Sequence, residues 1–288
     1  MPVNKVVIPV AGWGTRFLPA TKVQPKEMLP LVNKPLIQHA VEEAAASGIN
    51  QVIMVTAVGK EIIRKHFRRS LELEHYLDKK GKTDLLEEVR HISSLANIRY
   101  VYQKNQLGLG HAVAMAQRLV GNEPFAVILP DDIINASTPA LKQMLDIYGQ
   151  YGGSIVGVEQ VRKEDVGKYG IIRAEKIRDR LYKVLDLVEK PNIDESPSDL
   201  GVIGRYIIAP EIFRILKHTQ EGAIGEIQLT DGLKGLLSEQ PIYACEFEGV
   251  RYDTGTPLGM LKASVALGLK NPEFGSELQE YLRKIIAC

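Results

Sequence analysis

The chain is short of cysteine, of net charge and of long apolar runs, and each shortage excludes a class of protein. Only two of its 288 residues are cysteines, Cys245 and Cys288. They are too few for a disulfide framework and do not show metal-ligand spacing. The net charge is +1, so no overall field favours nucleic acid or a membrane surface as a partner. No apolar run approaches the roughly 18 residues that cross a bilayer.

Further absences concern the start of the chain and its organisation. Residues 1–5 lead directly into a strand-like segment and carry no signal-peptide pattern, so we expect a cytoplasmic protein. No internal repeat, low-complexity segment or convincing linker divides the chain. We therefore expect one domain over residues 1–288, with Cys245 buried as a small hydrophobe in its apolar run.

Strand-like and helix-like segments alternate along the first half of the chain, and this alternation favours an α/β fold. Short apolar runs predict strands at Val6–Val10, Gln51–Thr56, Ile98–Tyr102 and Phe125–Leu129. Periodic apolar spacing predicts helices at Leu36–Ser47, Lys60–Arg69, Gly110–Leu119 and Thr138–Gln150, and a charged helical hairpin at Leu71–His91 broken at Gly81. We expect Gly48 to end the first helix.

The pattern changes after Gly152, where strand candidates follow one another with little helix between them. They are Ser154–Glu159, Gly170–Ala174, Tyr182–Val188 and Val202–Ile208. Strands without intervening helices imply antiparallel pairing. Later segments predict helices at Glu211–Lys217, Ile227–Leu237, Pro257–Leu267 and Ser276–Ile286, and a strand at Ile242–Phe247.

The first strand ends at a glycine turn that is followed by cations. Gly12 and Gly14 allow backbone N–H groups to approach a phosphate closely. Arg16 and Lys26 add positive charge at the same place, in a loop stiffened by prolines. A glycine turn alone is equally compatible with an ordinary β-turn. The dinucleotide fingerprint fails because its third glycine position is Phe17, and no G-K-[ST] follows as in a P-loop.

Acids follow two other strand candidates. Asp131 and Asp132 come after Phe125–Leu129, at the edge where α/β sheets bind ligands. A carboxylate there can hold magnesium, which prefers oxygen ligands. Asp131 is also compatible with capping a helix or turn, and Asp132 with a solvated neighbour. Glu189 and Lys190 follow a later strand and suit sugar hydroxyls and a sugar phosphate, although an isolated E-K-P is more typical of a surface ion pair before a turn.

Two further motifs have alternative interpretations. Asp253 lies in an Asp-Thr-Gly triplet, which also occurs in aspartic proteases, but here the triplet occurs once and the chain is α/β. Asp253 is therefore either a second acid for a metal or part of the cap region of the helix at Pro257. Gln103 can donate and accept at the edge of uracil or thymine. Gly108 allows a base to lie against the backbone, and His111 is expected to be structural.

Several motifs in the right order resemble those of the nucleotidyltransferases that activate sugar 1-phosphates, and within them the branch that transfers uridylyl groups. The motifs are GWGTRFLP at 12–19, PKEMLP at 25–30, LGLGHA at 107–112, LPDD at 129–132, EKP at 189–191 and GEIQLTD at 225–231. The resemblance covers the chain from Val6 to about Leu267. Trp13 stands at a variable loop position and Asp132 at a site where relatives vary.

The resemblance implies a reaction and a role for each matching residue. UTP and glucose 1-phosphate would give UDP-glucose and pyrophosphate, with Mg²⁺ as cofactor. The implied residues are Ala11, Gly12, Gly14, Thr15, Gln103 and Gly108 for the nucleotide, Arg16, Lys26 and Lys190 for catalysis, Asp132, Gly170, Glu189 and Lys190 for the sugar phosphate, and Asp131 and Asp253 for the metal. The attacking phosphate is already ionised, so the task is to position both reactants and neutralise charge, and no general base is needed.

The resemblance also implies an architecture. It predicts a Rossmann-like three-layer fold with a mixed, mainly parallel central sheet. The nucleotide-binding half would cover about 1–150, the sugar-phosphate half about 151–256, and C-terminal helices about 257–288. Apolar faces on those helices could pack a partner subunit, and we expect a homodimer or homotetramer.

Three competing functions are weighed against this reaction. A thymidylyltransferase would use a base that differs by a methyl group and a sugar that lacks the 2′-hydroxyl, but GEIQLTD and the insert at 71–91 favour uridylyl transfer. A non-catalytic nucleotide-sugar sensor would be expected to lack Arg16, Lys26 or Asp131, and all three are present. A dehydrogenase is disfavoured by the missing third glycine.

Overall fold

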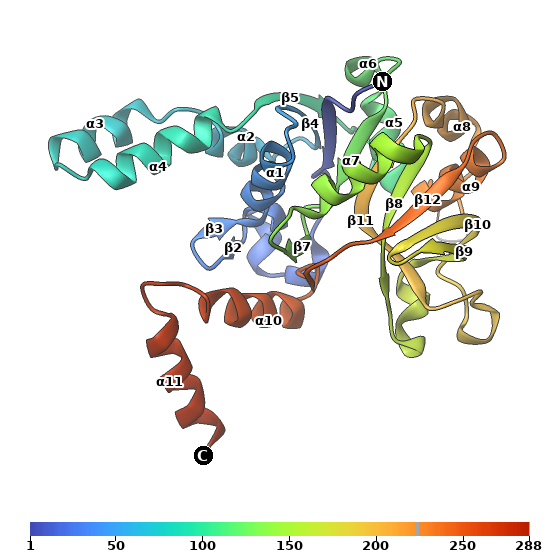
Figure 1. Cartoon of the computed structure of the whole chain (residues 1–288). Coiled ribbons are helices and arrows are strands. Elements are labelled where there is room, and N and C mark those ends of the chain that lie inside the picture. The colour runs from blue at the N-terminus through green and yellow to red at the C-terminus, as the bar shows by residue number, and fades with distance from the viewer. Residues whose placement is uncertain (223–224, 288) are drawn as a thin grey trace.

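The computed structural model describes residues 1–222 and 225–287, so Cys288 lies outside the described residues. Nine strands form its main sheet: β1 (Lys5–Pro9), β4 (Gln51–Thr56), β5 (Asn97–Tyr102), β6 (Phe125–Ile128), β8 (Ser154–Gln160), β9 (Gly170–Arg178), β10 (Leu181–Glu189), β11 (Leu200–Ile208) and β12 (Ile242–Glu246). Their order is β5-β4-β1-β6-β11-β8-β12-β10-β9 (Figure 1). Two small pairs complete the strands, β2 (Pro30–Leu31) with β3 (Lys34–Pro35), and β7 (Asp132–Asn135) with β13 (Val250–Asp253).

Helices connect and cover these strands. They are α1 (Leu36–Ala46), α2 (Glu61–His66), α3 (Leu71–Lys79), α4 (Thr83–Ser94), α5 (Leu109–Met115), α6 (Gln117–Val120), α7 (Ala140–Tyr151), α8 (Ile212–His218), α9 (Leu229–Leu237), α10 (Pro257–Gly268) and α11 (Gly275–Ile286). Short 3₁₀ turns lie at Thr15–Phe17, Ala20–Lys22, Lys26–Met28, Lys163–Lys168 and Ile193–Glu195. The first three of these turns structure the proline-rich loop that follows β1.

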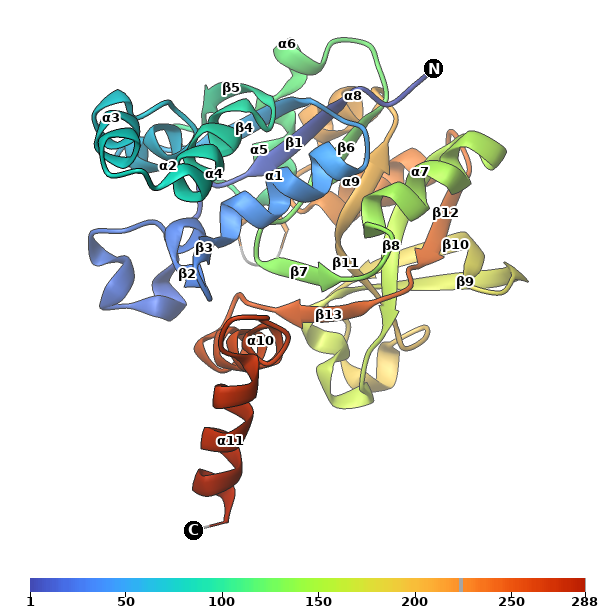
Figure 2. The same cartoon turned by 60° about the vertical axis from the view of Figure 1, so that its left-hand side comes forward.

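The central strands are apolar on both faces because helices cover both sides of the sheet. In β1, Val6 and Ile8 belong to the apolar cluster on one face, and Val7 to the cluster on the other, as the two-residue period of a strand requires. The first cluster is completed by α1 and α7 through residues such as Ile37 and Leu141, and the second by α5, α8 and α9. Figures 1 and 2 show these helix groups on opposite sides of the strands.

The sheet is mixed, as expected, and β10 and β11 are the two of its nine strands that run against the direction of the others. Strands β5, β4, β1 and β6 are parallel neighbours, and so are β12 and β8. In contrast, β11 runs antiparallel to β6, β8 and β9, and β10 runs antiparallel to β12 and β9. The antiparallel pairing expected after Gly152 is thus confirmed, most directly for β9 and β10, which follow one another in the chain without a helix between them.

Most helix predictions are confirmed, with small differences at the ends. Gly48 has a φ of +88°, and the next amide, that of Ile49, donates to the carbonyl of Ala44, which ends α1 in a Schellman motif. The predicted hairpin at 71–91 is α3 and α4, joined through residues 80–82. The predicted helix at 110–119 is divided at Ala116 into α5 and α6. Cys245 is buried, as expected.

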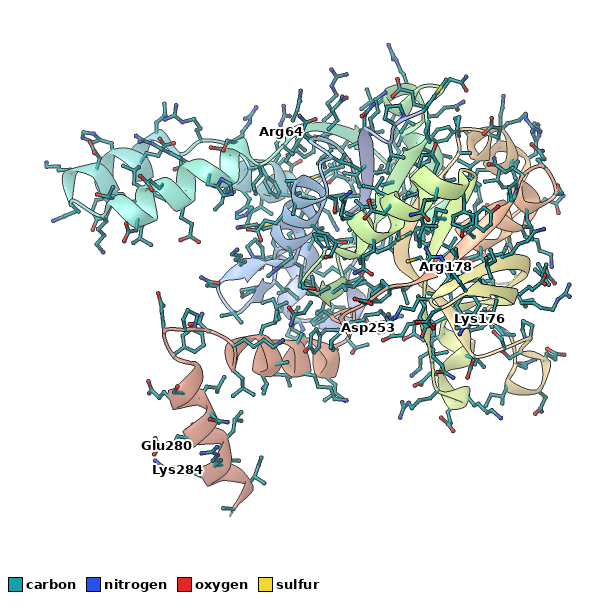
Figure 3. All side chains as sticks on the ribbon, viewed as in Figure 1. Arg64, Lys176, Arg178, Asp253, Glu280 and Lys284 are labelled. Atoms are coloured by element: carbon teal, nitrogen blue, oxygen red, sulfur yellow. The ribbon has the colours of Figure 1, made fainter. Side chains whose placement is uncertain are left out.

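Two parts of the chain project from the sheet. The hairpin of α3 and α4 extends on the side of β5, and α10 and α11 lead away on another side, with the C-terminus at the far tip (Figures 1 and 2). Figure 3 places Asp253 where the body of the molecule meets α10, and Glu280 and Lys284 on the projecting α11. Among the described residues, the search for a helix both long and apolar enough to span a membrane found none.

Candidate active site

Two cavities lie on either side of the loop that follows β1. The first, of about 540 Å³, is lined by these residues predicted from the sequence: Gly12, Gly14, Thr15, Arg16, Lys26, Asp131, Asp132, Gly170, Glu189, Lys190 and Asp253. The second, of about 390 Å³, is lined by Ala11 and Gln103 together with Trp13 and residues 21–25, 57–60, 104 and 106. The loops after β1, β6 and β10 converge here, so the carboxyl ends of strands from both halves of the sheet meet at one site.

Glycines shape the loop between the two cavities. A Cβ on Gly12 would meet no atom within 4 Å, so the packing of the fold leaves space there for a ligand. Gly14 has a φ of +67°, which favours glycine, and a Cβ there would lie 3.1 Å from Cβ of Lys26. The carbonyl of Gly14 accepts a hydrogen bond from Oγ1 of Thr21 at 2.8 Å. Gly14 thus brings the loop close to Lys26, as an anion site requires.

Lys26 and Asp131 form an ion pair in the lining of the first cavity. Nζ of Lys26 lies 2.5 Å from Oδ2 of Asp131. Burial by itself would lower the pKa of Lys26, but the charges of Asp131 and Glu27 outweigh burial and raise it. Burial would raise the pKa of Asp131, but the Lys26 ammonium opposes it and holds this pKa below its usual range. Both groups are therefore charged near neutral pH, and a polyphosphate can replace Asp131 as the partner of Lys26.

Asp131 and Asp253 are brought together by Gly255. A Cβ on Gly255 would lie 3.0 Å from Oδ1 of Asp253, 3.2 Å from Oδ2 of Asp131 and 3.6 Å from Nη1 of Arg16. The register of β13 with β7 places this turn, and both N and Oγ1 of Thr254 donate to the carbonyl of Asp131 at 2.7 Å. Thr256 and not Asp253 is the N-cap of α10, because Oγ1 of Thr256 accepts from Gly259 N, whereas Oδ1 of Asp253 accepts from the amide of Gly255 in the turn before the helix.

Asp132 is held by partners of its own. Its Oδ1 accepts from Nε of Arg251 at 2.5 Å, and its Oδ2 accepts from the amide of Gly204 at 3.1 Å. Arg251 also donates to Glu159 and lies over the ring of Tyr169, 5.1 Å from its centroid. Burial raises the pKa of Asp132, and Arg251 opposes that rise. Asp132 lines the first cavity, but its contact with a sugar stays a prediction.

Glu189 and Lys190 lie on the opposite wall of the first cavity, at the end of β10. Nζ of Lys190 lies 3.3 Å from Oε1 of Glu189. Lys190 has a φ of +45°, an unfavourable conformation for a residue with a side chain, and its amide donates to the carbonyl of Tyr169. A Cβ on Gly170 would approach Oε2 of Glu189 to 3.3 Å. These residues therefore form one polar wall of the cavity, in which the side chain of Lys190 remains 43% exposed.

The predicted base-binding residues have unequal support. Gln103 is buried, and its Nε2 donates to Nδ1 of His111 at 2.8 Å, which agrees with a structural role for His111. Gly108 has a φ of +99°, and a Cβ there would lie 2.8 Å from Cβ of Glu226. Gly108 is thus required by the close passage of the segment at 226–227. It appears in the lining of neither cavity, whereas its neighbour Leu109 lines the first.

The loops of the site are held by a set of largely buried cations that no sequence pattern predicted. Lys60 donates to the carbonyls of Val10 and Gly12, both at 2.6 Å, and to Oε2 of the buried Glu27 at 2.9 Å. Burial lowers the pKa of Lys60 and raises that of Glu27. No local signal marks these residues, because Lys60 is 33 positions from Glu27 and 48 from Gly12.

Arg205 supports the other side of the site. Its side chain is 1% exposed and forms two hydrogen bonds with the carboxylate of Glu43, at 2.9 and 2.7 Å. It also donates to the carbonyls of Leu129 and Asp132, on either side of Asp131. Arg205 lies within the apolar sequence of β11, and an isolated arginine in a strand predicted to be buried was the one available signal of such a role.

The donor set at Asp131 and Asp253 fits a divalent cation. No group of three or more His, Cys, Asp or Glu able to hold a metal is found in the described part of the chain. Two carboxylates close to a polyphosphate site nevertheless suit Mg²⁺, which is usually held by one or two carboxylates together with phosphate oxygens and water. The site is therefore suited to a metal that enters with a nucleotide.

Comparisons with known proteins place the chain among nucleotidyl transferases. A family model described as "Nucleotidyl transferase" matches residues 5–268. The chain is 53% identical over 284 residues to the UTP–glucose-1-phosphate uridylyltransferase YngB of Bacillus subtilis, covering 99% of this chain and 96% of that protein. It is 48% identical to a UTP–glucose-1-phosphate uridylyltransferase of Staphylococcus epidermidis, covering 98% of each.

Solved structures show the same α/β fold. A UDP-glucose pyrophosphorylase from Acinetobacter baumannii superimposes with a TM-score of 0.91 at 38% identity, covering 98% of this chain and 99% of that one. A UDP-glucose pyrophosphorylase complexed with UDP-glucose gives a TM-score of 0.86 at 45% identity, covering 93% of this chain and all of the other. With a matching family model over most of its length and relatives of this similarity, the chain belongs to the nucleotidyl transferase family.

Proposed function

We propose that the protein transfers the uridylyl group of UTP to glucose 1-phosphate and so forms UDP-glucose and pyrophosphate. One observation carries the proposal: the glycine loop with Arg16 and Lys26 shares a single cavity with the wall formed by Glu189 and Lys190. An anion site for a nucleotide thus faces a site suited to a sugar phosphate. The printed names of the relatives, which are 48–53% identical, support the same pair of substrates.

The proposed step is an in-line displacement at phosphorus. An oxygen of the sugar phosphate forms a bond to the α-phosphorus of UTP, while the bond from that phosphorus to the oxygen bridging to the β-phosphorus breaks. Pyrophosphate leaves with the electron pair of the broken bond. The nucleophile is already ionised, so catalysis depends on positioning two anions and neutralising their charge.

Each charged side chain of the cavity has a role in this scheme. Lys190 guides the attacking phosphate, and Glu189 accepts hydrogen bonds from sugar hydroxyls. Arg16 and Lys26 stabilise the negative charge that grows on the departing pyrophosphate. The backbone N–H groups near Gly12 and Gly14 bind the phosphates, and Gln103 binds the base edge.

We propose Mg²⁺ as the cofactor, held by the carboxylates of Asp131 and Asp253, which both lie close to Gly255. Bound there, the ion would neutralise phosphate charge. Without it, Lys26 is the partner of Asp131, so binding of a metal and nucleotide would move Lys26 from the carboxylate to the phosphates.

Three further features stay proposals. The three-layer, Rossmann-like description is supported by apolar clusters on both faces of the sheet. A single domain with nucleotide and sugar-phosphate halves is supported by the pairing of β6 with β11, which joins them in one sheet. A homodimer or homotetramer is supported by exposed apolar residues on α10 and α11, among them Leu261 and Ile285. The cytoplasmic location stays a prediction from the sequence.

The test is pyrophosphate release from nucleoside triphosphates crossed with sugar 1-phosphates, with Mg²⁺ and with a chelator. We expect Mg²⁺-dependent release with UTP and glucose 1-phosphate, well above that with TTP. Preference for TTP would move the protein to thymidylyl transfer. No release with any pair, although nucleotides bind, would contradict catalysis and favour a nucleotide-sugar sensor.

A further inference from the structure

The second cavity contains the most exposed cluster of apolar side chains near the site. Trp13, the chain's one tryptophan, is 74% exposed, and Val23 and Val58, which line the same cavity, are 87% and 83% exposed. None of the three belongs to an apolar core cluster. Trp13 also makes no side-chain hydrogen bond within residues 1–222 and 225–287. The fold therefore gains little from this tryptophan, which points to a ligand as the partner of its ring.

The loop that carries Trp13 divides the two cavities. Gly12 and Gly14 line the first cavity, whereas Ala11 and Trp13 line the second. A triphosphate bound along Gly12–Arg16 in the first cavity must extend its nucleoside away from the charged wall at Lys190. The second cavity receives it, because Gln103 lies there with its Nε2 bound to His111 and its carbonyl oxygen without a described protein partner.

Resting on the proposed function, we propose that Trp13 is the aromatic platform on which the base of the bound nucleotide stacks. The backbone on both sides of Trp13 is already fixed. Lys60 holds the carbonyl of Gly12 at 2.6 Å, and Thr21 holds that of Gly14 at 2.8 Å. The ring is thus presented from a positioned backbone, so stacking costs little ordering of the loop.

Stacking on an aromatic ring strengthens binding without reading the edge of the base. Replacing such a ring by alanine typically weakens binding by about 5- to 150-fold, from about 1–3 kcal/mol per stacked base. The same contact exists before and during the reaction, so its loss raises KM for the nucleotide and leaves kcat nearly unchanged. Trp13→Ala should weaken UTP and TTP to a similar extent, because Gln103 and not Trp13 contacts the base edge.

Fluorescence excited selectively in tryptophan reports Trp13 alone and tests the platform without relying on turnover. We expect UTP to change the emission of the wild-type protein with saturation, and inorganic triphosphate and glucose 1-phosphate to leave it nearly unchanged. An equal change with inorganic triphosphate would show that phosphate binding alone moves Trp13, and would overturn the stacking contact.

Kinetics of variants provide the second arm. We expect Trp13→Ala to raise KM for UTP while kcat and thermal stability stay unchanged. Trp13→Phe, which keeps an aromatic ring, should recover most of the affinity. The control Tyr76→Ala, which removes an exposed ring on α3, should behave as wild type. Two results would overturn the role of Trp13 but not the proposed function. The first is a wild-type protein that forms UDP-glucose although UTP leaves its tryptophan emission unchanged. The second is a Trp13→Ala protein whose KM for UTP equals that of the wild type. No product with any substrate pair would instead overturn the proposed function.

Discussion

Two ion pairs at the base of the active site connect distant segments of the chain, whereas those of the α3–α4 hairpin connect neighbouring ones. Lys26 and Asp131 are 105 residues apart, and Arg251 and Asp132 are 119 apart. In the hairpin, Glu74 pairs with Arg69 and Arg90, only 5 and 16 residues away.

The exposure of the arginines differs in the same way between the two regions, although the side chain of Glu74 is itself only 4% exposed. The side chains of Arg205 and Arg251 are 1% and 8% exposed, but those of Arg69 and Arg90 are 58% and 53% exposed. A buried pair between distant segments fixes loops relative to one another and costs much to break, whereas a local pair with exposed arginines stabilises its own hairpin and is partly screened by water. Activity should therefore depend on the first kind of pair and not on the second.

The largest expected effect on stability is that of Arg205→Met. It leaves the largely buried carboxylate of Glu43 without its cation and removes the donors to the carbonyls on both sides of Asp131. We expect the free energy of unfolding to fall by about 3–5 kcal/mol, measured by urea denaturation. A loss below about 1 kcal/mol would show that this buried pair is no different from an exposed one.

The largest expected effect on turnover is that of Lys26→Ala. We expect kcat to fall on the order of 10²–10³-fold, because charge on the leaving pyrophosphate loses a cation. Removal of Lys26 also leaves Asp131 unpaired, so denaturation is followed in parallel. Lys142→Ala is the control, since Lys142 forms an exposed pair with Asp146 on α7. Turnover near that of the wild type in a folded Lys26→Ala protein would reject the catalytic role.

A smaller and more specific effect is expected from Lys60→Met. The carbonyls of Val10 and Gly12 lose their donor, so the glycine loop shifts and KM for UTP rises more than kcat falls. The protein is also destabilised because Glu27 remains buried without its cation. In Lys60→Met/Glu27→Met, stability should recover while KM stays raised. Recovery of both would assign Lys60 to stability alone.

The smallest effect is expected in the hairpin, on acidification. A hydrogen bond from Arg69 lowers the pKa of Glu74 from 4.5 to about 2. Burial opposes this shift, and Arg90 adds to it. A carboxylate whose pKa is lower in the folded protein than in the unfolded chain stabilises the fold at pH values above its unfolded pKa. This contribution is lost as the pH falls from about 4.5 through about 2. Hydrogen exchange should show faster opening of α3 and α4 over that window, with Glu74→Gln already open at higher pH. Equal hydrogen exchange in the wild type and in Glu74→Gln would show that the ion pair of Glu74 with Arg69 does not stabilise the hairpin.

Much of the fold could be predicted because its signals are local. The apolar run of β1, the glycine after α1 and the change of pattern after Gly152 each depend on residues close in sequence. The order of the strands was less accessible, since the antiparallel position of β11 between β6 and β8 depends on contacts between distant segments. The pairing of β7 with β13 was missed for the same reason, and with it the way Asp253 reaches Asp131.

The site shows the same division. Side chains that would contact a ligand, such as Arg16, Asp131 and Lys190, follow strand ends and could be predicted from sequence. The side chains that hold them, Lys60 and Arg205, have partners 33 to 162 residues away and carry no local pattern. Prediction from the sequence therefore found the groups that would perform the chemistry and missed those that position them.

The most direct test of the account is the fate of label in UTP incubated with glucose 1-phosphate. We predict that label on the α-phosphorus appears in UDP-glucose and that label on the β- or γ-phosphorus appears in pyrophosphate, because the sugar phosphate attacks the α-phosphorus. Transfer of γ-label to the sugar, or release of labelled inorganic phosphate with UDP, would place the attack at another phosphorus and contradict the central claim.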